Sequence, residues 1–213
     1  MMKIVSINIA VPTNIQFNNE NVSTGIYKQS VTGPVAINST GIEGDSIIDT
    51  AVHGGLDQAV YLYHQEDYDW WSEQLGKGVE PGAFGENLTI AGAKDIDWVI
   101  GDHININGVE LEITAPRVPC FKLGVKMGDS KIVKQFVQAV RPGAYVRVIT
   151  PGTVAVGDEL RVTKTEQDYA TVKDVFKEWH SKNKSLETIK KALASPIGRV
   201  HKAVLQDWYD AMK

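Results

Sequence analysis

Glycine and proline are concentrated in one part of this chain, and their distribution constrains the fold more than any other feature. Residues 1–165 contain 18 of the 19 glycines and 7 of the 8 prolines, whereas residues 166–213 contain one of each. Both residue types interrupt helices and are typical of short strands joined by tight turns. We therefore predict a β-rich body over residues 1–165, followed by a helical segment over residues 166–213.

Short runs of apolar, β-branched and aromatic residues predict the strands of the body. The Asn107-Gly108 pair is a strong signal for a hairpin between residues 104–106 and 109–113. A second hairpin is predicted around Thr32-Gly33, between residues 25–31 and 34–37. The remaining predicted strands cover residues 4–9, 59–63, 144–149 and 159–163, and two helices are predicted over residues 65–75 and 131–140.

Two segments share a pattern that favours a barrel over a doubly wound sheet. Residues 99–106 and 155–162 each contain an apolar pair, a Gly-Asp turn and then alternating apolar residues. Glycine supplies the positive φ of such a corner, and the strand that follows has one apolar face. Two corners of this kind are typical of a small barrel. We predict a mainly β fold with helices (α+β), built on a β-barrel body.

Capping residues predict three helices in the C-terminal segment. Thr171 and Asp174 resemble a capping box, and Ser185 is positioned to cap a second helix. Ser195 precedes Pro196, which fits a cap followed by proline at the first helical position of a third helix. A unit of this size is marginally stable alone, so we expect it to dock on the body or on a partner.

Composition and charge exclude several classes of protein. The chain has 22 basic and 26 acidic residues, a net charge of −4, and the body alone is at 13 − 19 = −6. An acidic body without a basic stripe disfavours a nucleic-acid partner. No apolar run is long enough to cross a membrane, and residues 1–11 do not resemble a secretory leader. We expect a cytoplasmic protein, and the sequence leaves open whether it forms a homodimer.

The single cysteine is the first candidate for chemistry. Cys120 excludes an intrachain disulfide and cannot by itself hold an iron–sulfur cluster. Arg117 and Lys122 flank it, and neighbouring cations favour a thiolate, which is a ligand for soft or high-valent metals. The alternative is that Cys120 is a small apolar residue of the core.

Two loops and one strand supply further candidate residues. His53, Gly54 and Gly55 could approach an anion closely, although such glycines are also common in simple turns. Glu86 and Asn87 precede a predicted strand and could hydrogen-bond a heteroaromatic ligand, or could serve only as a capped turn. Arg147 could hold a phosphate or could be an exposed cation. No GxGxxG or P-loop motif is present.

These segments together resemble the MOSC domain, the family named for the C-terminal domain of molybdenum-cofactor sulfurases. The matching motifs, in chain order, are Gly44-Asp45, His53-Gly54-Gly55, Gly85-Glu86-Asn87-Leu88-Thr89, Arg117-x-Pro119-Cys120-x-Lys122-Leu123 and Gly157-Asp158. The C-terminal helices resemble those of the stand-alone bacterial type, so the resemblance covers nearly the whole chain.

The resemblance implies a site for the molybdenum cofactor, a molybdopterin, with Cys120 as the protein ligand to molybdenum. Arg117 and Lys122 are implied to neutralise the cofactor. The other residues implied at the site are His53, Gly54, Gly55, Glu86, Asn87 and Arg147. The implied reaction is reduction of N-hydroxylated compounds, such as hydroxylaminopurines or amidoximes, as a detoxification.

The electrons for this reaction are implied to come from a separate flavin or iron–sulfur reductase, because the sequence has no nicotinamide fingerprint and no cluster cysteines. Two other functions stay open at this point. The domain could carry the cofactor, or sulfur on Cys120, without catalysis. A cysteine hydrolase with His53 as base is disfavoured, because nothing local orients such a base.

Overall fold

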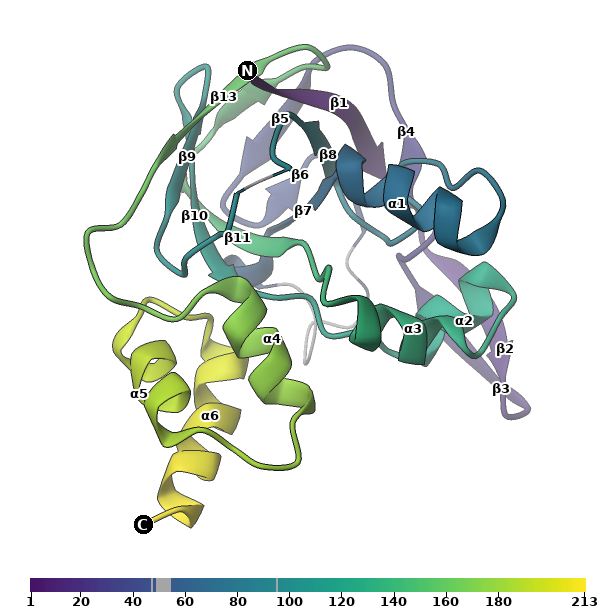
Figure 1. The fold of residues 1–213 in the computed structure, drawn as a ribbon. Helices are drawn as coiled ribbons and strands as arrows, with labels where there is room; N and C mark the ends of the chain where they lie inside the picture. The colour runs from purple at the N-terminus through teal and green to yellow at the C-terminus, as the bar shows by residue number, and fades with distance from the viewer. Residues whose placement is uncertain (47, 49–54, 95) are drawn as a thin grey trace.

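A closed β-barrel forms the centre of the protein in a computed structural model that describes residues 1–46, 48, 55–94 and 96–213 (Figure 1). Around the barrel the strands follow the order β13, β9, β10, β11, β7, β8 and β1, and β1 closes it by pairing with β13. All these pairs are antiparallel except β7 with β8. The predicted barrel and the α+β class are therefore confirmed.

The barrel strands are β1 (Met2–Ile9), β7 (Val60–His64), β8 (Leu88–Ala91), β9 (His103–Ile106), β10 (Val109–Ala115), β11 (Ala144–Thr150) and β13 (Glu159–Thr163). The shorter strands outside it are β2 (Thr13–Phe17), β3 (Glu20–Thr24), β4 (Gln29–Ser30), β5 (Val35–Asn38), β6 (Gly41–Ile42) and β12 (Gly152–Val154). The helices are η1 (Leu56–Gln58), α1 (Gln65–Leu75), α2 (Phe121–Met127), α3 (Ile132–Ala139), α4 (Val172–His180), α5 (Leu186–Ala194) and α6 (Arg199–Ala211).

The strands alternate as their sequences predict, and their inward residues fill the barrel. Val109, Leu111 and Ile113 of β10 are fully buried, whereas Glu110 and Glu112 between them are only partly buried. The predicted hairpin around Asn107-Gly108 is confirmed, with β9 paired to β10 in register. Removing these apolar faces from water is the main favourable contribution to the stability of the barrel.

The predicted hairpin around Thr32-Gly33 is wrong. The strand on its first side, β4, pairs with the end of β1, whereas β5 pairs with β12 and β6. Pro34 has no N–H to donate, and Gly33 has a φ of 85°, so the chain changes direction without joining the two strands to each other. A hairpin that was not predicted, β2–β3, projects beside α2 (Figure 1).

The three predicted C-terminal helices form and pack on the barrel. Val172 and Val175 of α4, Ile189 of α5 and Leu205 of α6 belong to the same buried cluster as the barrel strands. The predicted capping box is present, since the Thr171 hydroxyl accepts from the Asp174 N–H and the Asp174 carboxylate accepts from the Thr171 N–H. None of the helices in the described ranges is long and apolar enough to span a membrane.

The third C-terminal helix begins later than predicted. Gly198, not Ser195, is the residue that precedes α6, and the Ser195 hydroxyl donates to the Ala192 carbonyl at 2.6 Å at the end of α5. The Gly198 N–H donates to the Thr114 carbonyl at 3.0 Å, and the Arg199 N–H donates to Asp57 at 2.8 Å. These bonds to the body fix the chain before the helix starts, so local capping chemistry does not decide its first residue.

We expect Gly143→Ala to destabilise the barrel strongly, because a Cβ there would lie 2.4 Å from the Leu62 carbonyl oxygen. Gly143 also has a φ of 62°, which a residue with a side chain adopts only with strain. The two effects together should lower the free energy of unfolding by at least about 2 kcal/mol. Gly108→Ala is the matched control, because Gly108 has a similar φ of 88° but no atom near its Cβ position. Urea unfolding of both variants measures the difference, and equal losses would contradict the close approach.

Candidate functional site

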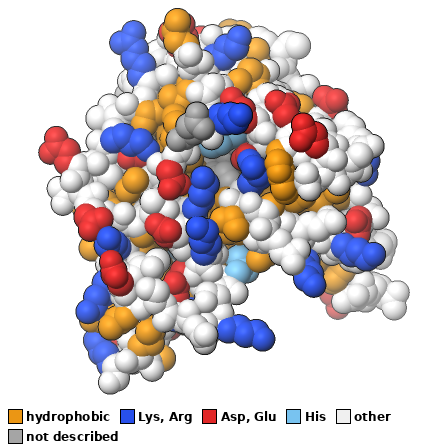
Figure 2. Space-filling model, in the orientation of Figure 1, with side chains coloured by type: hydrophobic (Ala, Val, Ile, Leu, Met, Phe, Trp, Pro, Cys, Tyr) orange, Lys and Arg blue, Asp and Glu red, His pale blue; other side chains and the backbone are white. Residues whose placement is uncertain are grey.

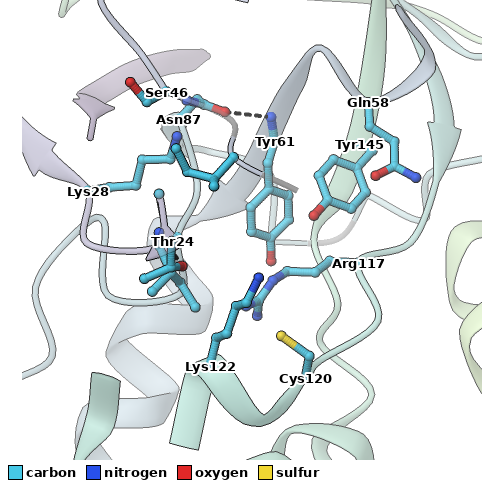
Figure 3. A pocket seen from close by; sticks show the side chains of 14 residues that line it. Thr24, Lys28, Ser46, Gln58, Tyr61, Asn87, Arg117, Cys120, Lys122 and Tyr145 are labelled. Carbon is cyan, nitrogen blue, oxygen red and sulfur yellow. Dashed lines mark hydrogen bonds between the residues drawn. The ribbon is translucent and has the colours of Figure 1, made fainter. Parts of the chain in front are cut away.

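A cleft of about 660 Å³, open to solvent, lies at one end of the barrel beside the start of α2 (Figure 3). Its walls come from segments far apart in sequence, which include the end of β3, the residues before β4, the middle of β7 and the segment from Arg117 to Lys122. The cationic side chains that line it are Lys28, Arg117 and Lys122, and none of the described lining residues is acidic. The cleft therefore suits an anionic ligand.

Cys120 is positioned in this cleft by the turn before α2. Its backbone is extended at the residue that precedes the helix, and its carbonyl accepts from the Leu123 N–H at 3.0 Å. The side chain is only partly buried and lines the cleft together with Arg117 and Lys122, toward which it lies in Figure 3. Cys120 is thus not sealed in the core, and the alternative that it is a simple core residue loses its support.

Arg117 is the most informative neighbour of the cysteine. Its side chain is 5% exposed, and its guanidinium lies over the rings of Tyr61 and Phe136, at 5.6 and 5.4 Å from their centroids. Burial by itself lowers the pKa of Arg117, but the ionisable Tyr61, Tyr145 and Cys120 around it raise that pKa overall. It is therefore a permanent cation.

One nitrogen of this buried guanidinium has no partner among the described residues. Arg117 bonds to the Tyr145 side chain, yet no group in the described part of the chain pairs with its Nη1 atom. Buried polar atoms are almost always hydrogen-bonded in folded proteins, and leaving a charged one unpaired is costly. An anionic group bound beside Cys120 would give this guanidinium the charge partner that it lacks among the described residues.

Lys122 comes from the first turn of α2 and is 8% exposed. In Figure 3 its side chain extends into the cleft alongside that of Arg117. The structure thus brings Cys120, Arg117 and Lys122 together, as their shared motif predicts.

Two tyrosines that the sequence analysis did not select also line the cleft. Tyr61 of β7 and Tyr145 of β11 face each other as cross-strand partners, with ring centroids 5.1 Å apart. Burial raises the pKa of both phenols, so both are neutral hydrogen-bond donors at physiological pH. Their strands were predicted, and the alternation within 59–63 and 144–149 is the signal that could have placed both rings on one face.

Glu86 and Asn87 stabilise the structure around the cleft through hydrogen bonds within the protein. Glu86 is fully buried, does not line the cleft, and accepts from the Tyr68 hydroxyl at 2.6 Å and the Thr89 hydroxyl at 2.8 Å. Its pKa is raised, because burial disfavours its charge.

Asn87 does line the cleft, but its amide is already engaged. Its oxygen accepts from the Tyr61 N–H at 3.1 Å, and its nitrogen donates to Asp45 at 2.9 Å and to the Asn8 carbonyl at 3.3 Å. Asp45 in turn pairs with Lys28. These bonds fix the relative positions of β1, β7 and the start of β8 beneath the cleft.

The structure brings none of the other described site candidates to the cleft. His53 and Gly54 are outside the described residues, and Gly55 is exposed before η1 and does not line the cleft. Arg147 is not brought to the cleft, because it pairs with Asp57 at 2.9 Å and Glu112 at 3.2 Å and donates to the Pro196 carbonyl at 2.8 Å. These bonds of the Arg147 guanidinium connect the barrel to the segment that precedes α6.

A partly buried lysine of α2 connects the cysteine segment to the opposite wall of the cleft. Lys126 donates to the Ile26 carbonyl at 2.7 Å and to the Gly82 carbonyl. Desolvation by burial lowers the pKa of Lys126 to about 8, despite the attraction of Glu86.

This pKa predicts a pH dependence of stability. A lysine in the unfolded chain keeps a pKa of about 10.4, so between pH 8 and that value the unfolded state binds more protons and stability rises with pH. Below pH 8 Lys126 is charged in the folded protein as well, and the cost of desolvating that charge lowers the free energy of unfolding by its full amount. We expect Lys126→Met to flatten the rise of the unfolding free energy between about pH 7.5 and 10, measured by urea unfolding. An identical slope in both proteins would contradict the low pKa.

The donor set fits a cofactor that brings most of its own metal ligands. Among the described residues, no three His, Cys, Asp or Glu side chains come together to hold a metal ion. The Cys120 sulfur, the unpaired guanidinium nitrogen of Arg117 and a second cation, Lys122, are instead suited to an anionic organic group that carries a metal.

The chain is similar to a known domain family and to proteins of known structure. The family model of the MOSC domain matches residues 49–161. The chain is 34% identical to the uncharacterised protein YflK of Bacillus subtilis, over 75% of this chain and 72% of YflK. It is 31% identical to a protein of Gibberella moniliformis named a reductase, over 83% of this chain but only 32% of that protein. The crystal structure of YiiM from Geobacillus stearothermophilus superposes with a TM-score of 0.81 at 25% identity, covering 98% of this chain and all of that one.

Proposed function

This chain belongs to the MOSC domain family, and on that premise we propose that it is a molybdenum-cofactor enzyme that reduces N-hydroxylated compounds to amines. The observation that carries the proposal is the buried Nη1 atom of Arg117, which has no partner among the described residues, beside the accessible Cys120 in one cationic cleft. The overall reaction would be R–NHOH + 2 e⁻ + 2 H⁺ → R–NH₂ + H₂O. Hydroxylaminopurines and amidoximes are the substrates proposed, and the role would be detoxification.

Each residue of the cleft has a separate task in this proposal. Cys120 supplies the protein's thiolate ligand to molybdenum. Arg117 and Lys122 hold the anionic part of the pterin cofactor and neutralise its charge. When bound, the molybdenum cofactor supplies the two-electron chemistry at the N–O bond.

The two phenols are positioned to serve the substrate. Tyr145 lies beside Arg117, and its neutral hydroxyl can donate to an oxygen or nitrogen acceptor in the cleft. The hydroxyl of Tyr61 donates to the Pro142 carbonyl at 2.8 Å, which fixes its ring as a wall. A planar substrate could stack on such a wall and be oriented toward Cys120.

Turnover with a chemical reductant tests the proposal. Protein from a host that makes the cofactor is mixed anaerobically with reduced methyl viologen and 6-hydroxylaminopurine, and adenine is quantified by chromatography. We expect one adenine for every two electrons consumed. A carrier of the cofactor would bind it without turnover, a hydrolase would act equally in protein without molybdenum, and either result would overturn the proposal.

A further inference from the structure

A second cleft lies on another side of the barrel, at the junction with the C-terminal helices. It has a volume of about 900 Å³ including its open mouth, and its described walls are the start of α1, residues 94 and 96–98, residues 139–143 and the first turns of α4. On the face seen in Figure 2, Lys and Arg side chains gather near the middle of the view, around a hollow. The chemistry proposed above does not use this cleft.

The charge of this second cleft is positive, although the body as a whole is acidic. Its described lining includes four cations and two carboxylates, and the cations are Lys94, Lys173, Lys177 and Arg141. Arg141 pairs with Asp67 and stacks over Trp70, and Lys173 lies 3.7 Å from Asp97. Lys94 and Lys177 are exposed and have no ion-pair partner within the described ranges.

The two clefts share a wall. Tyr61 lines the cleft of Cys120, and its hydroxyl donates at 2.8 Å to the carbonyl of Pro142, which lines the second cleft. A second connection runs through α3, since Phe136 contacts Arg117 and the helix ends at Ala139 in the wall of the second cleft. The linings of the two clefts are therefore connected directly, by the Tyr61–Pro142 hydrogen bond and by α3.

The proposed reaction needs electrons from outside the chain. One cysteine cannot hold an iron–sulfur cluster, and no nicotinamide fingerprint is present. Two of the four acidic residues of α1 are already engaged within the protein, because Glu66 accepts from the Gly92 N–H and Asp67 pairs with Arg141. The basic cleft is the surface whose charge and position both suit a donor.

We infer that the second cleft is the docking site for an acidic flavoprotein that delivers electrons to the Cys120 cleft. This inference rests on the proposed function. A reduced flavin holds two electrons, the number that the reaction consumes. Complementary charge steers such a partner and makes the association depend on salt.

Charge reversal tests the docking site. The double variant Lys94→Glu/Lys177→Glu is compared with Lys190→Glu/Lys202→Glu, which makes the same charge change at exposed lysines of α5 and α6. The probe is a bacterial flavodoxin kept reduced by its reductase, with 6-hydroxylaminopurine as substrate. We expect the cleft variant to raise the KM for flavodoxin about tenfold or more at low salt, and the control variant to leave it within about twofold. Neither variant should change turnover with methyl viologen.

Binding of oxidised flavodoxin, measured by calorimetry, separates the two proposals. If flavodoxin binds and the cleft variant abolishes binding, but methyl viologen supports no turnover, the docking site stands and the proposed function fails. If methyl viologen supports turnover but both variants bind flavodoxin equally, or the wild type does not bind it, the docking site is wrong and the proposed function stands.

Discussion

Cys120→Ser is expected to abolish turnover while leaving the fold intact. Residues that only support a metal ligand commonly cost about 10- to 100-fold, so loss of the ligand itself should cost more than about 100-fold in turnover. The side chain is partly buried at the edge of a cleft, so the free energy of unfolding should change by no more than about 1 kcal/mol.

The experiment pairs activity with unfolding measurements on the same preparations. Turnover is followed with reduced methyl viologen, and unfolding with urea. Molybdenum retained after gel filtration should also fall in the variant. Equal molybdenum content in the wild type and the variant would remove Cys120 from the metal site.

Arg117→Ala is expected to weaken retention of the cofactor far more than Arg199→Ala. Arg117 is buried with a donor nitrogen that has no partner among the described residues, and a charged hydrogen bond contributes about 1.5–3 kcal/mol, or roughly 10- to 100-fold in affinity. Arg199 is exposed at the start of α6, so Arg199→Ala removes the same charge at a position outside the cleft.

A second variant keeps this prediction testable if the alanine protein folds poorly. Arg117→Met retains much of the volume beneath Tyr61 and Phe136 but has no charge and no donor. Pterin content after gel filtration is the readout, with the thermal midpoint as a check on folding. If Arg199→Ala loses as much pterin as either Arg117 variant, Arg117 does not hold the cofactor.

Local sequence patterns predicted the elements whose structure is decided locally. The Asn107-Gly108 hairpin and the Thr171 capping box depend on residues close in the chain, and both form as expected. The pairing of β4 with β1, and of β1 with β13, joins residues far apart. Nothing within a short window of sequence specifies such pairs, which is why the Thr32-Gly33 hairpin was predicted wrongly.

Only part of the site was predicted, because only some of its residues are brought together by local sequence. Arg117, Cys120 and Lys122 lie within six consecutive residues, so one turn brings them together. The helix α2 was not predicted, because two prolines precede it and Gly124 lies in its middle. Arg147 lies two residues after Tyr145 on β11, a spacing that puts both side chains on one face, but its partners Asp57 and Glu112 come from other elements and hold it away from the cleft. Those partners could not be identified from sequence alone.

The metal and pterin content of the wild-type protein tests the central claim most directly. The protein is expressed in a host that makes the molybdenum cofactor and purified without oxygen, and molybdenum is measured by mass spectrometry alongside the fluorescence of the oxidised pterin. We predict that molybdenum and pterin are recovered in equal amounts, approaching one of each per chain. A protein that folds and exposes Cys120 to thiol reagents, yet retains neither, would contradict the account.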